Sequence, residues 1–252
     1  MTHKLNVVAA GAALAALAAT AQEIETYVVP PDTPANILRA VESPERPEEQ
    51  RARDVSRKPA EILTMAAIDP GDHVIEIAGF GQYYTQLLAA AVGPDGRVDV
   101  YDLPYTERFA GEASREFAAA HPNVTYRQED YNAADFPENI DAVFNVLYYH
   151  DLLPKDVDTA AMNAKLFDAL EPGGIYLIVD HKAEDGSGWR DAATIHRMDV
   201  ATIREEVTAA GFELVLESDI LSHPEDDRTQ MVFSPGVRGG TDRAVFVFRK
   251  PT

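Results

Sequence analysis

Short apolar runs alternate along this chain with segments whose apolar positions recur at helical spacing. The first run spans His73 to Ala78, and the most continuous one spans Ile140 to Leu147. Between such runs, Tyr83 to Val92 carries apolar residues three and four positions apart, as an amphipathic helix does. Short apolar strands separated by helical patterns are typical of βαβ units, whose parallel strands are covered on both faces.

The complete pattern predicts seven strands and at least five helices. The last two strands follow one another without a helical pattern between them, so we expect them to be antiparallel. Right-handed crossovers join the others, which predicts an α/β protein with a doubly wound, mostly parallel seven-stranded sheet and an antiparallel last strand. The predicted strands are 73–78, 97–101, 124–128, 140–147, 174–179, 212–221 and 243–248, and the predicted helices are 59–67, 83–92, 105–120, 159–170 and 200–210.

Residues 1–21 have the pattern of a secretory signal peptide. Lys4 precedes an apolar run from Leu5 to Ala18, and Ala19-Thr20-Ala21 supplies small residues for cleavage. The run is shorter than the roughly 20 residues that cross a bilayer, which disfavours an uncleaved anchor. We therefore expect an exported protein, periplasmic or secreted, without stable membrane insertion after cleavage.

The remainder divides into an arm and one domain. Prolines at positions 30, 31, 34, 44 and 47 forbid a long helix, so residues 22–58 are predicted to form an extended N-terminal arm. Residues 59–252 contain all the predicted strands and form a single Rossmann-like domain.

Composition excludes some partners. The chain has no cysteine, so a structural zinc site built from thiolates is excluded. Its formal net charge is −20, which repels phosphate backbones, so we expect no nucleic acid as partner. A small molecule is the expected substrate. The oligomeric state is not predicted.

The end of the first strand carries the most informative residues. Glu76 closes the strand, and Gly79 and Gly81 lie in the turn before the next helix. Open α/β sheets bind nucleotide-like ligands at this position, where glycine lets the backbone approach the ligand. Asp102 ends the second strand, 102 − 76 = 26 residues later, close to where a ribose-binding carboxylate belongs. The structural alternatives are a helix-capping role for Glu76 and a solvated turn for Asp102.

Histidines beside carboxylates follow the fourth and fifth strands. His150-Asp151 follows the fourth strand, Asp180-His181 ends the fifth, and His196 comes after a glycine-bearing loop. A neutral imidazole can take a proton from a hydroxyl or amine near neutral pH, so His150 and His181 are the predicted catalytic residues. Capping of the following turn is the alternative for His150-Asp151. We predict no metal site, because the regular spacing of a metal motif is missing.

These strand ends and several further motifs resemble the class I S-adenosylmethionine-dependent methyltransferases. The resemblance covers roughly residues 59–250 and is greatest to a group of predicted exported methyltransferases. The motifs are Arg57-Lys58-Pro59, Glu76 with Gly81-x-Tyr83-Tyr84-Thr85, His150-Asp151, Leu170-x-Pro172-Gly173-Gly174, Asp180-His181, His196-Arg197 and Thr241-Asp242-Arg243.

The resemblance implies S-adenosylmethionine as cofactor. It places Glu76 near the methionine portion of the cofactor and Asp130-Tyr131 near the adenine, although Glu129 is an equally suitable carboxylate. Asn145 ends the fourth strand, where cofactor and substrate meet. The cofactor-binding residues are thus predicted to be Glu76, Gly79, Gly81, Asp102, Asp130, Tyr131 and Asn145.

The glycine turn departs from the pattern of these enzymes. Phe80 and Gln82 stand where glycines are usual, and Gly79 stands where a proline is common. Two functions are therefore considered. The first is methyl transfer from S-adenosylmethionine to a small molecule. The alternative is an exported, non-catalytic ligand-binding or degenerate member of this fold.

Overall fold

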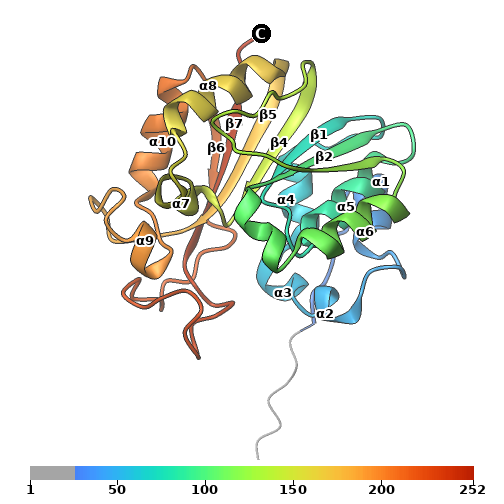
Figure 1. Ribbon diagram of the computed structural model, residues 1–252. Helices are drawn as coiled ribbons and strands as arrows, with labels where there is room; N and C mark the ends of the chain where they lie inside the picture. Colours follow the sequence, from blue (N-terminus) through green and yellow to red (C-terminus); the bar gives the residue numbers. More distant parts are fainter. Residues whose placement is uncertain (1–25) are drawn as a thin grey trace, which may run out of the picture.

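A computed structural model describes residues 26–252, so the predicted signal peptide lies outside the described residues. Within them, seven strands form one sheet in the order β3-β2-β1-β4-β5-β7-β6 (Figure 1). The predicted α/β class with a mostly parallel seven-stranded sheet is confirmed. The strands are β1 (His73–Ile77), β2 (Arg97–Asp102), β3 (Val124–Gln128), β4 (Ile140–Val146), β5 (Leu170–His181), β6 (Glu213–Ser218) and β7 (Arg243–Arg249).

Strand direction marks the place where a ligand can bind. β7 runs antiparallel to both neighbours, β5 and β6, and all the other strand pairs of the described sheet are parallel. β1 and β4 are neighbours, with Ile77 opposite Asn145. In the sheet, β2 and β3 follow on the outer side of β1, and β5, β7 and β6 follow on the outer side of β4. The carboxyl ends of β1 and β4 are therefore the topological switch point, where open α/β sheets bind ligands.

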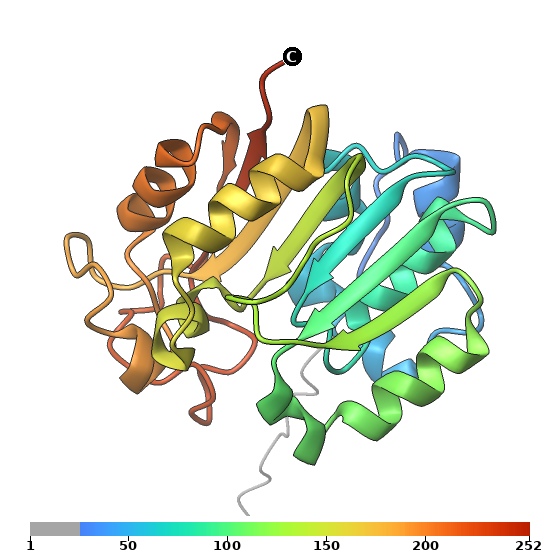
Figure 2. The same cartoon turned by 45° about the horizontal axis from the view of Figure 1, so that its top comes forward.

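Helices cover both faces of the sheet (Figure 2). Val74 of β1 packs with α1, α4 and α5, whereas Ile75 and Ile77 pack with α8 and α10. Successive side chains of a strand point to opposite faces, so one apolar strand contributes to both cores. The longer helices are α1 (Ala35–Val41), α4 (Pro59–Met65), α5 (Tyr83–Val92), α6 (Gly111–Ala120), α8 (Thr159–Ala169) and α10 (Val200–Ala209).

The segment predicted as an extended arm is helical over much of its described length, although residues 26–34 form no helix or strand. It contains α1 and two single-turn helices, α2 (Glu48–Arg51) and α3 (Asp54–Arg57). Ile37 is fully buried in the core that α1 shares with α5. Pro34 and Pro47 stand just before α1 and α2, where a missing N–H breaks no helix hydrogen bond. The prolines thus exclude one long helix but permit short ones.

A second difference concerns the predicted helix 105–120. The chain forms a 3₁₀ turn, η1 (Pro104–Arg108), and restarts as α6 at Gly111. Glycine favours the break, because a Cβ at Gly111 would push the carboxylate of Glu107 aside. No helix within residues 26–252 is long and apolar enough to cross a membrane.

Candidate active site

A cavity of about 260 Å³ opens at the carboxyl ends of β1 and β4. Figure 1 shows α3, α9 (Ala192–Ile195) and the β6–β7 segment (residues 219–242) at the same end of the sheet. Five of the predicted site residues line the cavity: Glu76, Gly79, Gly81, His150 and His181. Further lining residues come from α3 and the residue before it, from α5, from the helix α7 (Tyr149–Leu152) and from the β6–β7 segment, among them Arg53, Arg57, Tyr83, Asp151, Phe233 and Arg238.

The glycine turn wraps one side of this cavity. Gly81 has a φ of +91°, which only glycine adopts without strain, and there is open space around it. Glycine is therefore needed here for the backbone conformation and not for packing. Gly79 is required by packing, because a Cβ there would lie 2.6 Å from Val100 Cγ1. Gln82 has a positive φ of 50°, but its side chain donates to Ser114 Oγ at 2.9 Å. The side chain at position 82 therefore points to α6 and does not line the cavity.

Glu76 is a buried carboxyl that lines the cavity. Its Oε2 accepts a hydrogen bond from Thr85 Oγ1 at 2.6 Å, and the residue is 6% exposed. Burial raises the pKa of Glu76 to about 8, although the Thr85 hydroxyl opposes the rise. The side chain therefore carries a proton at neutral pH unless a cation lies beside it.

Arginines give the cavity a positive side in an acidic protein. Arg53, Arg57 and Arg238 line it, and the guanidinium carbons of Arg53 and Arg57 lie 5.2 and 4.6 Å from the ring centroid of Tyr83. Burial and the neighbouring Arg57 lower the pKa of Arg53. Guanidinium groups bind carboxylates and phosphates well, so the cavity suits a ligand with a negative group.

His150 is held by a buried carboxylate. Its Nδ1 lies 2.6 Å from Asp180 Oδ1, and its amide N–H donates to Asp180 Oδ2 at 2.8 Å. Burial alone would lower the pKa of His150, but the charge and hydrogen bond of Asp180 raise it above the ordinary value. His181 lacks such a partner and lies 2.8 Å from Thr241 Oγ1. Burial and the nearby cations hold the pKa of His181 well below its usual range.

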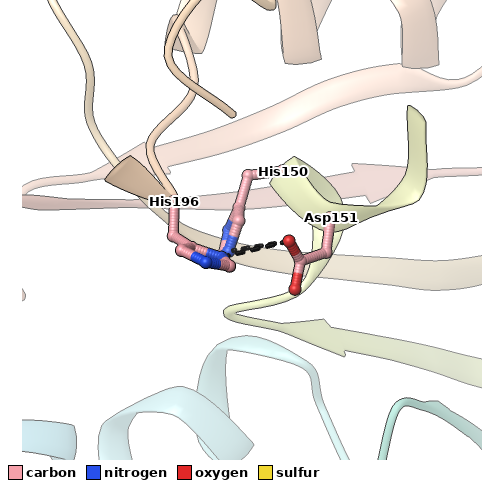
Figure 3. A group of neighbouring side chains, drawn as sticks. All are labelled: His150, Asp151 and His196. Atoms are coloured by element: carbon pink, nitrogen blue, oxygen red, sulfur yellow. Dashed lines mark ion pairs between the residues drawn. The ribbon is translucent and has the colours of Figure 1, made fainter. Parts of the chain in front are cut away.

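A second histidine approaches Asp151 at the edge of the cavity. His196 follows α9, and its Nδ1 lies 3.1 Å from Asp151 Oδ1. His150 Nε2 lies 3.9 Å from the same oxygen, and Figure 3 shows the three side chains together. Each offers a ligand atom, and these atoms lie within 4.8 Å of one another. The sequence had singled out all three residues, but their irregular spacing predicted no metal site.

An aromatic cluster separates the cavity from a second hollow. Phe80 lines the cavity and packs against Phe109 and Tyr148, with ring centroids 5.7 and 5.8 Å away. The Tyr148 hydroxyl lies 3.2 Å from that of Tyr105, which lines a hollow of about 500 Å³. We call Phe80, Tyr105, Phe109 and Tyr148 the aromatic cluster.

Asp102 lies in the interior and lines neither hollow. It is fully buried, and its Oδ2 accepts a hydrogen bond from the Tyr126 hydroxyl at 3.1 Å. Its Oδ1 has no hydrogen-bond partner among the described residues. Burial raises the pKa of Asp102 to about 6, against the opposing effect of Tyr126. The backbone of Gly79 and Phe80 and the Thr106 hydroxyl lie close enough to oppose this rise as well, so Oδ1 is a buried acceptor beside the glycine turn without a well-aligned donor in the described part of the chain.

The remaining predicted residues lie apart from the cavity. Asp130 is exposed, lines the second hollow and accepts the Asn132 amide at 3.0 Å. Tyr131 is a core residue whose hydroxyl donates to Tyr101 O at 2.7 Å. Asn145 is fully buried, and its Oδ1 also lacks a partner among residues 26–252. Phe233 and Arg238 were not predicted, because neither belongs to the Thr241-Asp242-Arg243 motif at the end of the β6–β7 segment or to any other motif.

Comparisons with known proteins agree with this architecture. A 167-residue stretch is 26% identical to the ubiquinone/menaquinone biosynthesis C-methyltransferase UbiE of Teredinibacter turnerae, and it spans 65% of each chain. A methyltransferase from Mesorhizobium loti has a TM-score of 0.57 at 15% identity, with 78% of this chain and 99% of that chain covered. An Aquifex aeolicus methyltransferase has a TM-score of 0.56 at 15% identity, with 79% and 98% covered. No family model matches the chain. The protein has the fold of the class I S-adenosylmethionine-dependent methyltransferases.

Proposed function

We propose that this protein transfers a methyl group from S-adenosylmethionine to a small molecule. The observation that carries the proposal is the single cavity at the switch point, which Glu76 and the glycine turn line on one side and His150 on the other. Ligands of open α/β sheets bind at this position. The relative from Teredinibacter turnerae is by name a methyltransferase of quinone biosynthesis, which supports a small acceptor.

The described residues fit the two ends of the cofactor. The carboxyl of Glu76 and the guanidinium groups of Arg53 and Arg57 match the ammonium and carboxylate of its methionine portion. The orphaned Oδ1 of Asp102 matches a ribose hydroxyl. Asp130 and Tyr131 are proposed to meet the adenine at the second hollow. Because Phe80 stands between the two ends, its ring must move when the cofactor binds.

The histidines supply the proton chemistry. The bound cofactor would supply a methyl group on a sulfonium sulfur. With Nδ1 hydrogen-bonded to Asp180, the Nε2 atom of neutral His150 can accept a proton from an attacking hydroxyl or amine. His181 stays neutral because its pKa is low, so at the same cavity it is available as a second base, although a weaker one than His150.

The aromatic cluster favours a second candidate function, which is ligand binding without methyl transfer. The cavity of about 260 Å³ is smaller than the roughly 300 to 1,000 Å³ of ordinary small-molecule sites. With the Phe80 ring in place, the cavity suits a small anion beside the arginines better than a whole adenosyl group.

Calorimetry separates the two functions. Purified protein is titrated with S-adenosylmethionine and with its demethylated product, S-adenosylhomocysteine. Heat and a rise in melting temperature with both ligands support methyl transfer, and neither effect at millimolar ligand supports the second candidate. Asp102→Ala is expected to weaken cofactor binding. His150→Ala is expected to keep binding and to slow the formation of S-adenosylhomocysteine with an acceptor panel of phenols, amines and carboxylic acids.

We also propose that the protein is exported and loses residues 1–21. The apolar run after Lys4 and the small residues up to Ala21 support this proposal. Fractionation of producing cells, with mass analysis of the chain, tests it. A mature chain beginning at Gln22 outside the cytoplasm is the expected result, and an intact cytoplasmic chain contradicts it.

A further inference from the structure

We propose that His150, Asp151 and His196 bind one divalent transition-metal ion at the edge of the cavity. Asp151 Oδ1 lies 3.1 Å from His196 Nδ1 and 3.9 Å from His150 Nε2, and all three ligand atoms lie within 4.8 Å of one another. In Figure 3, His150 and Asp151 project from α7, and His196 reaches the same point from a different part of the chain.

The hydrogen bonds of Asp180 prepare His150 to be a ligand. Asp180 accepts the amide N–H groups of His150 and His181 at 2.8 and 2.7 Å, so it acts as a carboxylate acceptor. His150 Nδ1, at 2.6 Å, must then carry the proton that it donates to Asp180. The lone pair of the neutral ring is on Nε2, on the side of Asp151. A carboxylate that orients a histidine in this way is the usual support of a metal ligand.

His196 brings a second unpaired nitrogen to the same place. Its Nδ1 is buried and has no hydrogen-bond partner within residues 26–252, although Asp151 is near. Phe233 covers the ring, with centroids 5.2 Å apart. When His196 carries its proton on Nε2, two imidazole lone pairs and a carboxylate oxygen converge and repel one another. A cation among the three removes this repulsion and satisfies all three atoms.

The donor set defines the class of ion. Two imidazole nitrogens and one carboxylate oxygen suit Zn²⁺, Co²⁺ or Fe²⁺, whereas Mg²⁺ and Ca²⁺ prefer all-oxygen sites. Metal–ligand bonds of about 2.0–2.2 Å place neighbouring ligand atoms roughly 3 to 3.5 Å apart, so a small movement of the side chains completes the site. His150 and Asp151 also line the cavity, so a free coordination position faces a ligand there.

The metal site does not depend on methyl transfer. With the ion bound, His150 Nε2 is a ligand and no longer a base. In the proposed transfer His181 would then take the proton of the acceptor, and the free position would hold an oxygen of the acceptor and orient it. Binding of the ion to the protein without other ligands tests the site alone, so failure of the cofactor to bind would leave the metal inference standing.

Titration of chelator-treated protein with Zn²⁺ and Co²⁺ is the experiment. We expect one ion per chain by calorimetry, Co²⁺ absorption bands in the visible range, and no comparable binding of Mg²⁺. His196→Gly removes one ligand while tolerating the φ of 56° at this position. We expect it to weaken Zn²⁺ binding at least about tenfold, since even supporting residues of metal sites contribute 10- to 100-fold.

Two further proteins complete the test. His121→Ala is the matched control, because the side chain of this histidine, at the end of α6, contacts Phe117 and lies away from the cavity, and we expect wild-type binding. Asp151→Asn keeps the side-chain volume and should weaken binding as His196→Gly does. A wild-type protein that binds no ion, or site variants that bind as tightly as His121→Ala, would overturn the inference.

Discussion

The ring of Phe80 packs edge-on against the ring of Tyr148, with centroids 5.8 Å apart. Tyr148 is nearly fully buried and Phe80 is partly buried, so the pair forms the inner part of the aromatic cluster. This contact lies between the cavity beside Glu76 and the second hollow beside Asp130. A phenylalanine thus stands between the two hollows, at a position where the resembled enzymes usually have glycine.

Phe80→Ala is expected to tighten the binding of S-adenosylhomocysteine. Phe80 makes two edge-on aromatic pairs, each worth about 0.5 to 1.5 kcal/mol. The ligand must break both contacts in the wild type but not in Phe80→Ala. The dissociation constant of the variant should therefore be roughly 5- to 150-fold lower. Calorimetry measures the change, and Phe117→Ala on α6 is the control for loss of a ring elsewhere. Equal affinity in wild type and Phe80→Ala would show that the ring is no barrier.

Arg57→Met is expected to weaken the binding of ligands that carry an amino-acid carboxylate. A hydrogen bond to a charged group contributes about 1.5 to 3 kcal/mol, which corresponds to roughly 10- to 150-fold in affinity. S-adenosylhomocysteine should lose this amount, and methylthioadenosine, which lacks the carboxylate, should lose little. Arg51→Met on the exposed face of α2 is the control. An equal loss for both ligands would contradict the proposed contact.

Stability should fall as pH rises from about 5 to 8, because of Glu76. Burial raises its folded-state pKa to about 8 from an ordinary value of 4.5, so in this window the native state binds a proton that the unfolded chain has released. Each pKa unit is worth about 1.4 kcal/mol, so wild type should lose roughly 2 kcal/mol more than Glu76→Gln between pH 6 and pH 8. Urea unfolding at both pH values measures this. Parallel losses would mean that Glu76 is ionised in the folded protein.

Asp54→Ala is expected to lower the free energy of unfolding by about 3 to 5 kcal/mol, because it leaves a buried cation unpaired. Both oxygens of Asp54 accept hydrogen bonds from Arg46, at 2.6 and 2.8 Å, and the Arg46 side chain is fully buried. The Tyr83 hydroxyl also donates to Asp54 at 2.6 Å, so the pair connects the N-terminal segment to the cavity wall. Urea unfolding tests the prediction, with exposed Glu49→Ala of α2 as a control expected to stay within about 0.5 kcal/mol.

The alternation of strand-like and helix-like spacing of apolar residues along the chain determined the sheet, its largely parallel strands and its antiparallel last strand. It also placed Glu76, Gly79, Gly81, His150 and His181 at strand ends that line one cavity. These features follow from local patterns, because the hydrophobic spacing of a strand or helix depends on neighbouring residues. The carboxyl ends of parallel strands then meet at one edge of the sheet. The short helices between the prolines were not predicted, since a single helical turn has too few residues to show a helical spacing of apolar positions.

Only the tertiary structure decided which side chains meet. His196 reaches Asp151 across 196 − 151 = 45 residues, Gln82 turns toward Ser114, and Phe80 turns toward Tyr148. The orientation of each depends on packing partners that are distant in sequence. A sequence specifies where a strand ends through local preferences of its own residues, whereas the direction of a side chain beyond that end depends on which neighbours the completed fold brings into contact.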